Sequence, residues 1–592
     1  MGGIAGFIDK RDAKAKSGII EEMSERIVHR GPGCADFYVN DTVAIVSRNI
    51  EASGSSGDKR LICNADKTKL IFFDGDVYNS SPEEILHGFE EQGCDILGNL
   101  RGTFAFVIWD SVKNEMFAAR DHFGAKPFYY ALFNDAFIFG SEIKSFIPHP
   151  DFKYELNGLA LKPYLTFQCS VLNETFFKNV YKLDAGHYLT YSGSVQTAKY
   201  HEYRFCPEEK SIDEYCREIR ETVRKSVDCR RPEGKATGAF LSGGIDSSYI
   251  TAMLLPDVTF SVGFDHKTFN ETGYAKELAD ILKIRNTSKI ITPDEFFGKI
   301  EDVQYYLDEP SANLSAVPLF FLSEMAGMEA GAVFSGEGAD ELFGGYNMYK
   351  LSKLDKIYRI IPKFIRYPVA KLAELAPRFY GRNFLILNGL PVEDIYVGQA
   401  FIFNERDKKK VLNQRFWNGP SYKEISRPYF MQVAGKDDVT KMQYLDMHLW
   451  LPHDILLKAD KMAMAHSLDV RAPFLDQVVF DLARKLPEGL KVNGDVTKYA
   501  LRVSAGEVIP EEWGKRPKLG FPVPVSDWLR EEKYYNLVKA EFKGEHTGDF
   551  FNKKELIKLL DSHYDGRKNN ARKIWTIYAF LLWYKVYFLE RR

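Results

Sequence analysis

The segment Phe240-Leu241-Ser242-Gly243-Gly244-Ile245-Asp246-Ser247-Ser248 decides the fold of the larger part of this 592-residue chain. It joins an apolar strand expected at 237–241 to a helix expected from about Asp246. Gly243 and Gly244 let the backbone approach an anion closely. The backbone N–H groups and the helix N-terminus then face a phosphate, and the serine hydroxyls add donors. The pattern predicts a phosphate-binding loop, and a plain helix cap with a glycine turn is the alternative interpretation.

The residues that follow this loop predict a parallel sheet. Strands expected at 258–262 and 332–335 alternate with helices expected at 211–227 and 272–282. Such alternation is typical of an α/β domain with helices on both faces of the sheet. From about residue 340 the pattern is mostly helical, up to an aromatic helix at 574–588.

Up to about residue 205 the pattern is different. Short alternating strands are separated by turn residues at short spacing, which predicts antiparallel sheets. The expected strands are 43–47, 69–73, 104–109, 116–119, 128–132 and 136–139, and the expected helices are 19–27 and 82–92. We therefore predict two domains, residues 1–205 and 206–592.

The composition limits the classes of partner. A formal net charge of -3 argues against a nucleic-acid partner and against a membrane surface, since both require a basic excess. Seven cysteines without a CxxC pair are typical neither of a disulfide framework nor of a zinc site. The chain opens without a signal peptide, and no apolar run reaches the ~20 residues of a membrane span. These features predict a soluble protein of the reducing cytoplasm.

Several further motifs occur in a fixed order. They are Asp308-Glu309-Pro310 with Ser315-Ala316-Val317-Pro318, Ser335-Gly336-Glu337-Gly338-Ala339-Asp340-Glu341-Leu342-Phe343-Gly344-Gly345-Tyr346, Lys458-Ala459-Asp460-Lys461-Met462, Val470-Arg471-Ala472-Pro473-Phe474-Leu475-Asp476 and Arg516-Pro517-Lys518-Leu519-Gly520-Phe521. The loop at 242–248 resembles the signature of the ATP pyrophosphatase fold, and the whole set resembles the asparagine synthetase family. The resemblance extends from the first residues to about residue 530.

The resemblance implies ATP and Mg²⁺ as cofactors and an AMP-forming reaction in which an amine attacks an acyl-adenylate. Asp246 and Asp340 match the family's metal ligands. Lys518 matches the lysine that meets charge developing on pyrophosphate, and Glu337 matches the carboxylate that assists the incoming amine. A solvated loop acid is the alternative for Glu337. The nucleotide-framing positions are Leu241, Ser242, Gly243, Gly244, Ser247, Val262, Ser335 and Gly336.

Three basic residues of these motifs have two interpretations. Lys461, Lys498 and Arg471 are either substrate or phosphate contacts or members of structural ion pairs.

The amino-terminal part resembles the glutaminase domain of the same family, an αββα sandwich of the N-terminal nucleophile hydrolase type. The motifs that carry this resemblance are Gly3-Ile4-Ala5-Gly6-Phe7, His29-Arg30-Gly31-Pro32, Gly102-Thr103-Phe104-Ala105-Phe106, Arg120-Asp121-His122-Phe123-Gly124-Ala125-Lys126-Pro127 and Gly140-Ser141-Glu142-Ile143-Lys144. The family's nucleophile is a cysteine directly after the initiator Met, and this chain has Gly2 there.

A second departure lies in the family's Asn-Gly-Glu turn, which here is Asp74-Gly75-Asp76. An ionised aspartate cannot donate a hydrogen bond to an oxyanion, and losing such a donor costs about a hundredfold in rate. Arg48 and Asp95 match residues that hold glutamine in the family. Two changes in separate motifs favour a glutaminase domain that is naturally inactive over an engineered Cys→Gly replacement.

Three functional hypotheses follow. The first is an amide ligase that adenylates a small-molecule or peptide carboxylate and couples it to ammonia or a substrate amine, as in the β-lactam synthetases and lasso-peptide cyclases that share a degenerate glutaminase site. The second is an asparagine synthetase proper, working from ammonia or carrying an engineered nucleophile replacement. The third is a non-catalytic scaffold. If the chain oligomerises, we expect a homodimer.

Overall fold

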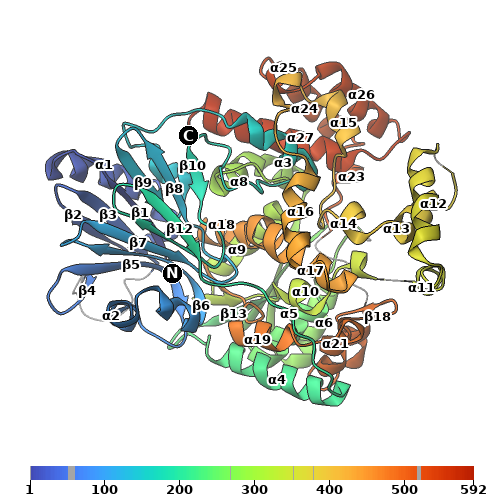
Figure 1. The fold of residues 1–592 in the computed structure, drawn as a ribbon, viewed down its shortest axis with the longest axis horizontal. Helices are drawn as coiled ribbons and strands as arrows, with labels where there is room; N and C mark the ends of the chain where they lie inside the picture. Colours follow the sequence, from blue (N-terminus) through green and yellow to red (C-terminus); the bar gives the residue numbers. More distant parts are fainter. Residues whose placement is uncertain (1, 51–60, 267–268, 351, 378, 517–521) are drawn as a thin grey trace.

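The computed structural model of the chain describes residues 2–50, 61–266, 269–350, 352–377, 379–516 and 522–592. Figure 1 shows the strands of the first 200 residues on one side of the molecule and the helical carboxyl-terminal part on the other. None of the helices in the described ranges combines the length and the apolar character that a bilayer crossing requires.

The first 200 residues form two six-stranded antiparallel sheets. The first sheet has the order β10-β8-β9-β1-β3-β2, and the second has the order β12-β11-β7-β6-β5-β4. The first comprises β1 (Gly2–Ile8), β2 (Cys34–Val39), β3 (Val43–Asn49), β8 (Tyr129–Phe133), β9 (Ala136–Gly140) and β10 (Val180–Lys182). The second comprises β4 (Ile62–Cys63), β5 (Lys69–Val77), β6 (Gly102–Asp110), β7 (Glu115–Arg120), β11 (His187–Tyr191) and β12 (Val195–Lys199).

Helices cover the outer faces of these two sheets. Helix α1 (Ala13–Glu25) packs on β1 and β3, and helix α2 (Pro82–Gln92) packs on β4 and β5. Buried side chains such as Ile45 and Val107 fill the space between the sheets. The expected αββα sandwich is therefore present.

The carboxyl-terminal part is built on a five-stranded parallel sheet of order β15-β14-β13-β16-β17. Its strands are β13 (Thr237–Phe240), β14 (Val258–Phe264), β15 (Arg285–Ile291), β16 (Ala332–Phe334) and β17 (Asp469–Arg471). The chain starts at β13, adds β14 and β15 on one side, and then crosses to add β16 and β17 on the other. In open sheets of this kind ligands bind at the carboxyl ends of the strands where the order reverses. This switch point lies between β13 and β16.

Helices cover both faces of the parallel sheet. Helices α4 (Ile212–Asp228), α5 (Ile245–Leu254) and α6 (Thr272–Leu282) contribute to one apolar cluster with β13. Helices α8 (Ile300–Leu307), α9 (Ala316–Gly327), α18 (Leu456–Met464) and α27 (Ala571–Tyr584) contribute to the other with β14. The second cluster continues into the amino-terminal part through α1 and α3 (Leu161–Phe167). One core thus joins the two sheet systems.

The remaining α-helices of the described residues lie in the carboxyl-terminal part. They are α7 (Pro293–Gly298), α10 (Ala339–Phe343), α11 (Lys353–Tyr358), α12 (Lys363–Leu375), α13 (Arg382–Gly389), α14 (Val392–Ile395), α15 (Glu405–Val411), α16 (Tyr422–Gln432), α17 (Asp438–Leu449), α19 (Gln477–Ala483), α20 (Glu488–Lys491), α21 (Tyr499–Ala505), α22 (Glu511–Lys515), α23 (Val525–Trp528), α24 (Glu532–Lys543), α25 (Thr547–Phe550) and α26 (Lys553–Tyr564).

Local signals explain which elements the sequence predicts well. The expected helices 82–92 and 272–282 coincide with α2 and α6. Helix α2 begins where predicted because Ser81 and Glu84 form a capping box before it. The helix expected at 19–27 is wrong at both ends, since α1 starts at Ala13 behind the cap residue Asp12 and ends at Glu25.

Candidate functional site

A cavity of about 750 Å³ lies at the switch point of the parallel sheet. Its volume falls within the ~300–1,000 Å³ that is typical of small-molecule sites. The structure brings the predicted ATP-site positions together on its wall, namely Leu241, Ser242, Gly243, Gly244, Asp246, Ser247, Val262, Ser335, Gly336, Glu337 and Asp340. Lys518 lies outside the described residues.

The loop after β13 is held by its own serines. Ser247 Oγ accepts the N–H of Ser242 at 3.2 Å, and Ser242 Oγ accepts the N–H of Gly244 at 3.3 Å. Gly243 has φ of +78°, and a side chain there would meet Tyr274 at 2.8 Å. Only glycine adopts this conformation without strain. The loop thus turns directly from the strand into the N-terminus of α5.

The loop after β16 packs against the first loop. A β-carbon added at Gly336 would lie 2.7 Å from the backbone of Asp246 and of Ser247. Any larger residue would separate the two loops. The glycine therefore lets Asp246 and Asp340 approach a common point.

Asp246 and Asp340 share one cation. Lys498 Nζ lies 2.7 Å from Asp340 Oδ1 and forms a second short ion pair with Asp246. Burial works to lower the pKa of Lys498, but the two carboxylates outweigh it, and the pKa is raised. Two carboxylates that converge on one positive atom fit a divalent cation whose other ligands are phosphate oxygens and water. Lys498 is thus an ion-pair partner of the expected metal ligands.

Glu337 also lies on the cavity wall, where its side chain faces Lys458. Lys458 Nζ lies 3.9 Å from Glu337 Oε1. Burial raises the pKa of Glu337, and this effect exceeds the opposing charge of Lys458. A raised pKa makes a carboxylate a better proton acceptor near neutral pH.

From Lys458 a continuous series of polar contacts follows the cavity wall to α27. Lys458 Nζ donates to Ser315 Oγ at 3.1 Å, and Ser315 Oγ donates to Asn313 Oδ1 at 2.7 Å. The buried carboxylate of Asp454 accepts the amide N–H groups of Asn313 and Gln168 at 3.0 and 2.9 Å.

The series ends at Arg572. Arg572 Nη2 donates to Gln168 Oε1 at 2.6 Å, and Arg572 lines the cavity. The Arg572 guanidinium and the Lys458 ammonium therefore face the cavity beyond the phosphate loop, together with the two side-chain amides of this series. Such groups suit a polar second substrate that carries an anionic group.

Sequence reasoning missed several residues of this wall. Gln168, Glu271 and Arg572 lie outside the motifs, and Gln168 and Arg572 are 404 positions apart. Lys458 lies within the motif 458–462, and Asn313 lies between the motifs 308–310 and 315–318. Their position in or next to a motif was therefore the signal that could have identified them. Burial raises the pKa of Glu271 to about 7, with Arg516 opposing the shift.

The amino-terminal site is arranged differently. The backbone N–H of Gly2 donates to Asp74 Oδ1 at 3.1 Å, and Arg30 Nη2 lies 3.0 Å from Asp74 Oδ2. A β-carbon added at Gly2 would lie 1.8 Å from the carbonyl oxygen of Arg48. The backbone of β3 therefore closes over the position where a nucleophilic side chain would start.

Arg30 is the centre of a buried ion network around this position. It also contacts Glu142 at 3.1 Å and Asp460 of α18 at 2.7 Å. The network continues through buried ion pairs of Lys126 with Asp460, of Lys144 with Glu142 and Asp308, and of Lys461 with Asp308. Lys461 Nζ also lies 3.5 Å from Glu142 Oε1, so Lys461 forms an ion pair between the two parts of the chain.

The other predicted glutaminase positions are dispersed. The Arg48 guanidinium donates to Ser24 and Glu25 at the end of α1. Asp76 pairs with Arg471 at 3.2 Å, and Gly75 has φ of +119° within β5. Asp95 is exposed on a short 3₁₀ helix (Gly93–Asn99). Arg471, like Lys461, is therefore a member of an ion pair.

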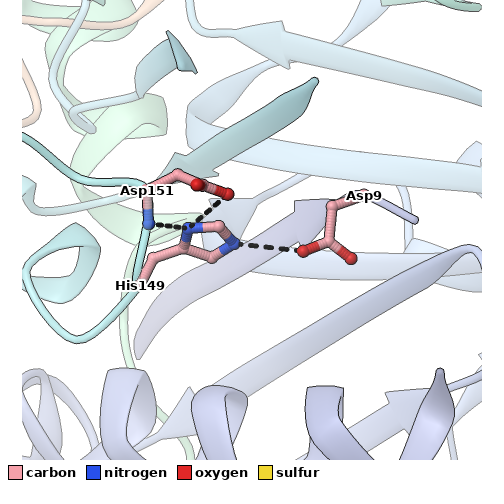
Figure 2. A group of neighbouring side chains, drawn as sticks. All are labelled: Asp9, His149 and Asp151. Atoms are coloured by element: carbon pink, nitrogen blue, oxygen red, sulfur yellow. Dashed lines mark hydrogen bonds and ion pairs between the residues drawn. The ribbon is translucent and has the colours of Figure 1, made fainter. Parts of the chain in front are cut away.

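One other group of titratable residues, Asp9, His149 and Asp151, has the ligand types of a metal site (Figure 2). His149 Nε2 lies 3.4 Å from Asp9 Oδ2, and its Nδ1 faces the backbone N–H of Asp151 at 3.3 Å. Arg11 and Lys16 already pair with Asp9. Their hydrogen bonds and that of His149 outweigh burial and hold the pKa of Asp9 below its usual value. We interpret the group as an ion-pair cluster.

Comparison with known proteins covers both parts of the chain. Residues 218–585 match the model of the asparagine synthase family, and residues 1–203 match that of the glutamine amidotransferase domain. A Bacillus subtilis (strain 168) protein named glutamine-hydrolyzing asparagine synthetase 1 is 35% identical over 96% of this chain and 93% of its own length. A Mycobacterium bovis protein named putative glutamine-hydrolyzing asparagine synthetase is 33% identical over 88% of this chain and 84% of its own length.

Proposed function

Since the chain belongs to the asparagine synthase family, and is therefore an ATP-dependent carbon–nitrogen ligase, we propose that it forms an amide without hydrolysing glutamine. It adenylates a carboxylate, releases pyrophosphate, and transfers the acyl group from AMP to ammonia or to a substrate amine. The closed position at Gly2, combined with an open cavity at the switch point of the parallel sheet, is the observation that carries this proposal.

The amino-terminal geometry supports the absence of a glutaminase. Gly2 supplies no thiol, and the Arg48 carbonyl leaves no room for one to be added. Asp74, at the position where a hydrogen-bond donor is needed, instead accepts bonds from Gly2, Arg30 and Ser141. A carboxylate held in this way cannot stabilise an oxyanion. These contacts favour Gly2 as the natural residue at this position. They argue against a single engineered replacement there.

The cavity supplies the groups that adenylation requires. The backbone N–H groups after β13 would hold the departing pyrophosphate, and Asp246 with Asp340 would hold Mg²⁺. When bound, Mg²⁺ neutralises the charge on the phosphates. Glu337 accepts the proton of the attacking amine, and Lys458 opposes the charge of that carboxylate. From the family resemblance we assign Lys518, which lies outside the described residues, to the charge that develops on the leaving group.

The acid and the amine are bound at the Arg572 end of the wall in this proposal. Arg572 and Lys458 suit an acid with a second anionic group, and the amides of Gln168 and Asn313 orient it. The identity with relatives named asparagine synthetases favours aspartate with free ammonia as a specific second candidate.

The test is release of pyrophosphate and AMP from ATP and Mg²⁺ in the presence of paired acids and amines. Aspartate with ammonium, aspartate with glutamine, and a panel of other acids with ammonium form the first set. We expect turnover with ammonium or a free amine and none with glutamine as the nitrogen source.

Two results would contradict the proposal. Glutamate release from glutamine would show a working glutaminase. Formation of ADP with inorganic phosphate would show that the acid is not adenylated.

A further inference from the structure

Helices α11, α12 and α13, residues 353–389, form a helical arm at one margin of the molecule (Figure 1). Helices α12 and α13 pack mainly on each other. The arm leaves the body after Tyr349 and returns to it at Tyr396. Both tyrosine hydroxyls bond the buried carboxylate of Asp446. The base of the arm is therefore fixed beside the cavity, which Tyr346 and Gln399 line.

The arm concentrates exposed apolar side chains. Of the 31 exposed large hydrophobic side chains among the described residues, 13 lie between Leu354 and Leu387. Leu375 is 86% exposed, Ile360 is 79% exposed and Phe364 is 77% exposed. Single exposed apolar residues are normal, but a contiguous group marks an interaction site.

The arm's own packing does not use these side chains. The side of α12 that faces α13 consists of Arg366, Ala370 and Ala373, which are buried. Gly389 of α13 approaches Ala370 so closely that a β-carbon there would lie 2.5 Å away. Phe364, Leu372 and Leu375 follow one another at helical spacing and stay exposed.

The charge of the arm differs in sign from that of the rest of the chain. Residues 353–389 contain eight Lys and Arg against two Asp and Glu, a formal charge of +6. The other 555 residues contain 71 basic and 80 acidic residues, a formal charge of -9. The net charge of -3 argues against a membrane surface for the chain as a whole. It is nevertheless the sum of an acidic body and one strongly basic, apolar segment.

We propose that the helical arm docks the protein on an anionic lipid bilayer. Its exposed Leu, Ile and Phe side chains enter the headgroup region, and those of its basic residues that are not buried, such as Lys363, pair with lipid phosphates. This combination is typical of interfacial helices. Each Lys or Arg near an anionic surface strengthens binding about fivefold. An arm docked in this way holds the cavity close to the lipid surface, since the base of the arm lies beside it.

A second copy of the chain fits less well. Two arms related by a twofold axis would bring a charge of +6 against another of +6. An arm placed on the acidic body of a second copy would form a head-to-tail contact, which does not close unless a ring forms. A bilayer satisfies the charge and covers the apolar side chains together.

The experiment is co-sedimentation of the full chain with lipid vesicles. One set contains phosphatidylcholine alone, and the other contains about 30 mol % phosphatidylglycerol, which supplies the anionic surface. The test variant is Phe364→Ser with Leu372→Ser and Leu375→Ser. The matched control is Met328→Ser with Met431→Ser and Leu537→Ser, three exposed apolar residues outside the arm. Circular dichroism checks that both variants fold.

We expect the wild type and the control to bind the anionic vesicles, and the arm variant to bind at least about tenfold more weakly. High salt should weaken binding, because it screens the charge contribution. Equal binding to both kinds of vesicle, or none to the anionic ones, would overturn the proposal. So would a dimer in sedimentation velocity that the arm variant no longer forms, since a second copy would then cover the arm. None of these measurements depends on turnover.

Discussion

The charged side chains of the two candidate sites differ in their exposure and in the partners that they bind. Around Gly2, Arg30 and its carboxylate partners Asp74, Glu142 and Asp460 have side chains no more than 3% exposed, and each partner is a protein group. At the switch point, Asp246 and Asp340 keep side-chain exposures of 21% and 20% and face a cavity of about 750 Å³.

The difference separates charges that stabilise the fold from charges that bind. A buried cation with several protein carboxylates has no capacity left for a ligand, and removing it leaves uncompensated charge inside the protein. A carboxylate at the edge of a cavity can exchange its lysine partner for an incoming cation. We therefore expect mutations at the first site to change stability, and mutations at the second to change chemistry.

Replacing Arg30 is expected to have the largest effect. Arg30→Ala leaves three buried carboxylates without their shared cation, and we expect a loss of about 3–5 kcal/mol in the free energy of unfolding. Urea denaturation measures this loss. The control is Arg204→Ala, whose side chain is 81% exposed beside Glu202 and should change stability by no more than about 1 kcal/mol. An Arg30→Ala chain as stable as the control would show that the network does not join the two parts of the protein.

Asp246→Asn tests the other side of the comparison. We expect it to lower pyrophosphate release by about 100- to 1000-fold, because half of the carboxylate pair for the cation is lost. Stability should change little, since the side chain faces the cavity. Asp151→Asn, at a similar side-chain exposure of 24% in the amino-terminal cluster, is the matched control and should keep its turnover. Retention of most activity in Asp246→Asn would remove this residue from the metal site.

Gly2→Cys asks whether the amino-terminal site can be restored. The added β-carbon must displace the backbone of Arg48, so we expect a loss of about 1–3 kcal/mol in unfolding free energy, typical of overpacking. We expect no glutamate release from glutamine, because Asp74 accepts bonds from Arg30 and Ser141 and offers no hydrogen-bond donor to an oxyanion. Gly18→Cys is the control, since a β-carbon there meets nothing within 4 Å. Glutaminase activity at wild-type stability would show that the site is only missing its thiol.

Residues close in sequence were the predictable part of the fold. The parallel sheet, the loop after β13 and the helices α2 and α6 follow from local patterns of apolar residues, glycines and caps. The strands β1 and β15 were not among those predicted, because the first is rich in glycine and the second is largely polar. Strands of these kinds are formed by their neighbours in the sheet rather than by their own propensity.

The site at the switch point likewise contains residues that local sequence predicts and residues that it does not. The motif residues from Leu241 to Asp340 were predictable because two short loops carry them. Lys498 as the shared partner of two aspartates, and Arg572 beside Gln168, depend on contacts across 158 to 404 positions. The closure of β3 over Gly2 is likewise a property of the register between β1 and β3. No local pattern records such distances.

The smallest predicted effect is the pH dependence of nucleotide binding that Glu271 causes. It tests most directly whether charged side chains that face the cavity act on a bound ligand. The pKa of Glu271, raised by burial to about 7, makes the side chain neutral below that pH and anionic above it. Because an anionic Glu271 repels the phosphates of a nucleotide in the same cavity, affinity should fall as pH rises through 7. We expect the Kd of a non-hydrolysable ATP analogue to rise about 3- to 10-fold between about pH 6 and about pH 8. Calorimetric titration measures it.

In Glu271→Gln most of this rise should disappear, leaving only the contribution of Glu337, whose pKa burial also raises. Asp280→Asn, on the exposed side of helix α6, which begins directly after Glu271, should keep the wild-type dependence. The same raised pKa makes the folded state hold its proton longer than the unfolded chain does, so this residue's contribution to stability decreases as pH rises from the usual glutamate value toward 7. If Glu271→Gln kept the full pH dependence of nucleotide binding, the carboxylate would not act on the ligand, and the contrast between the two sites would rest on Asp246 and Asp340 alone.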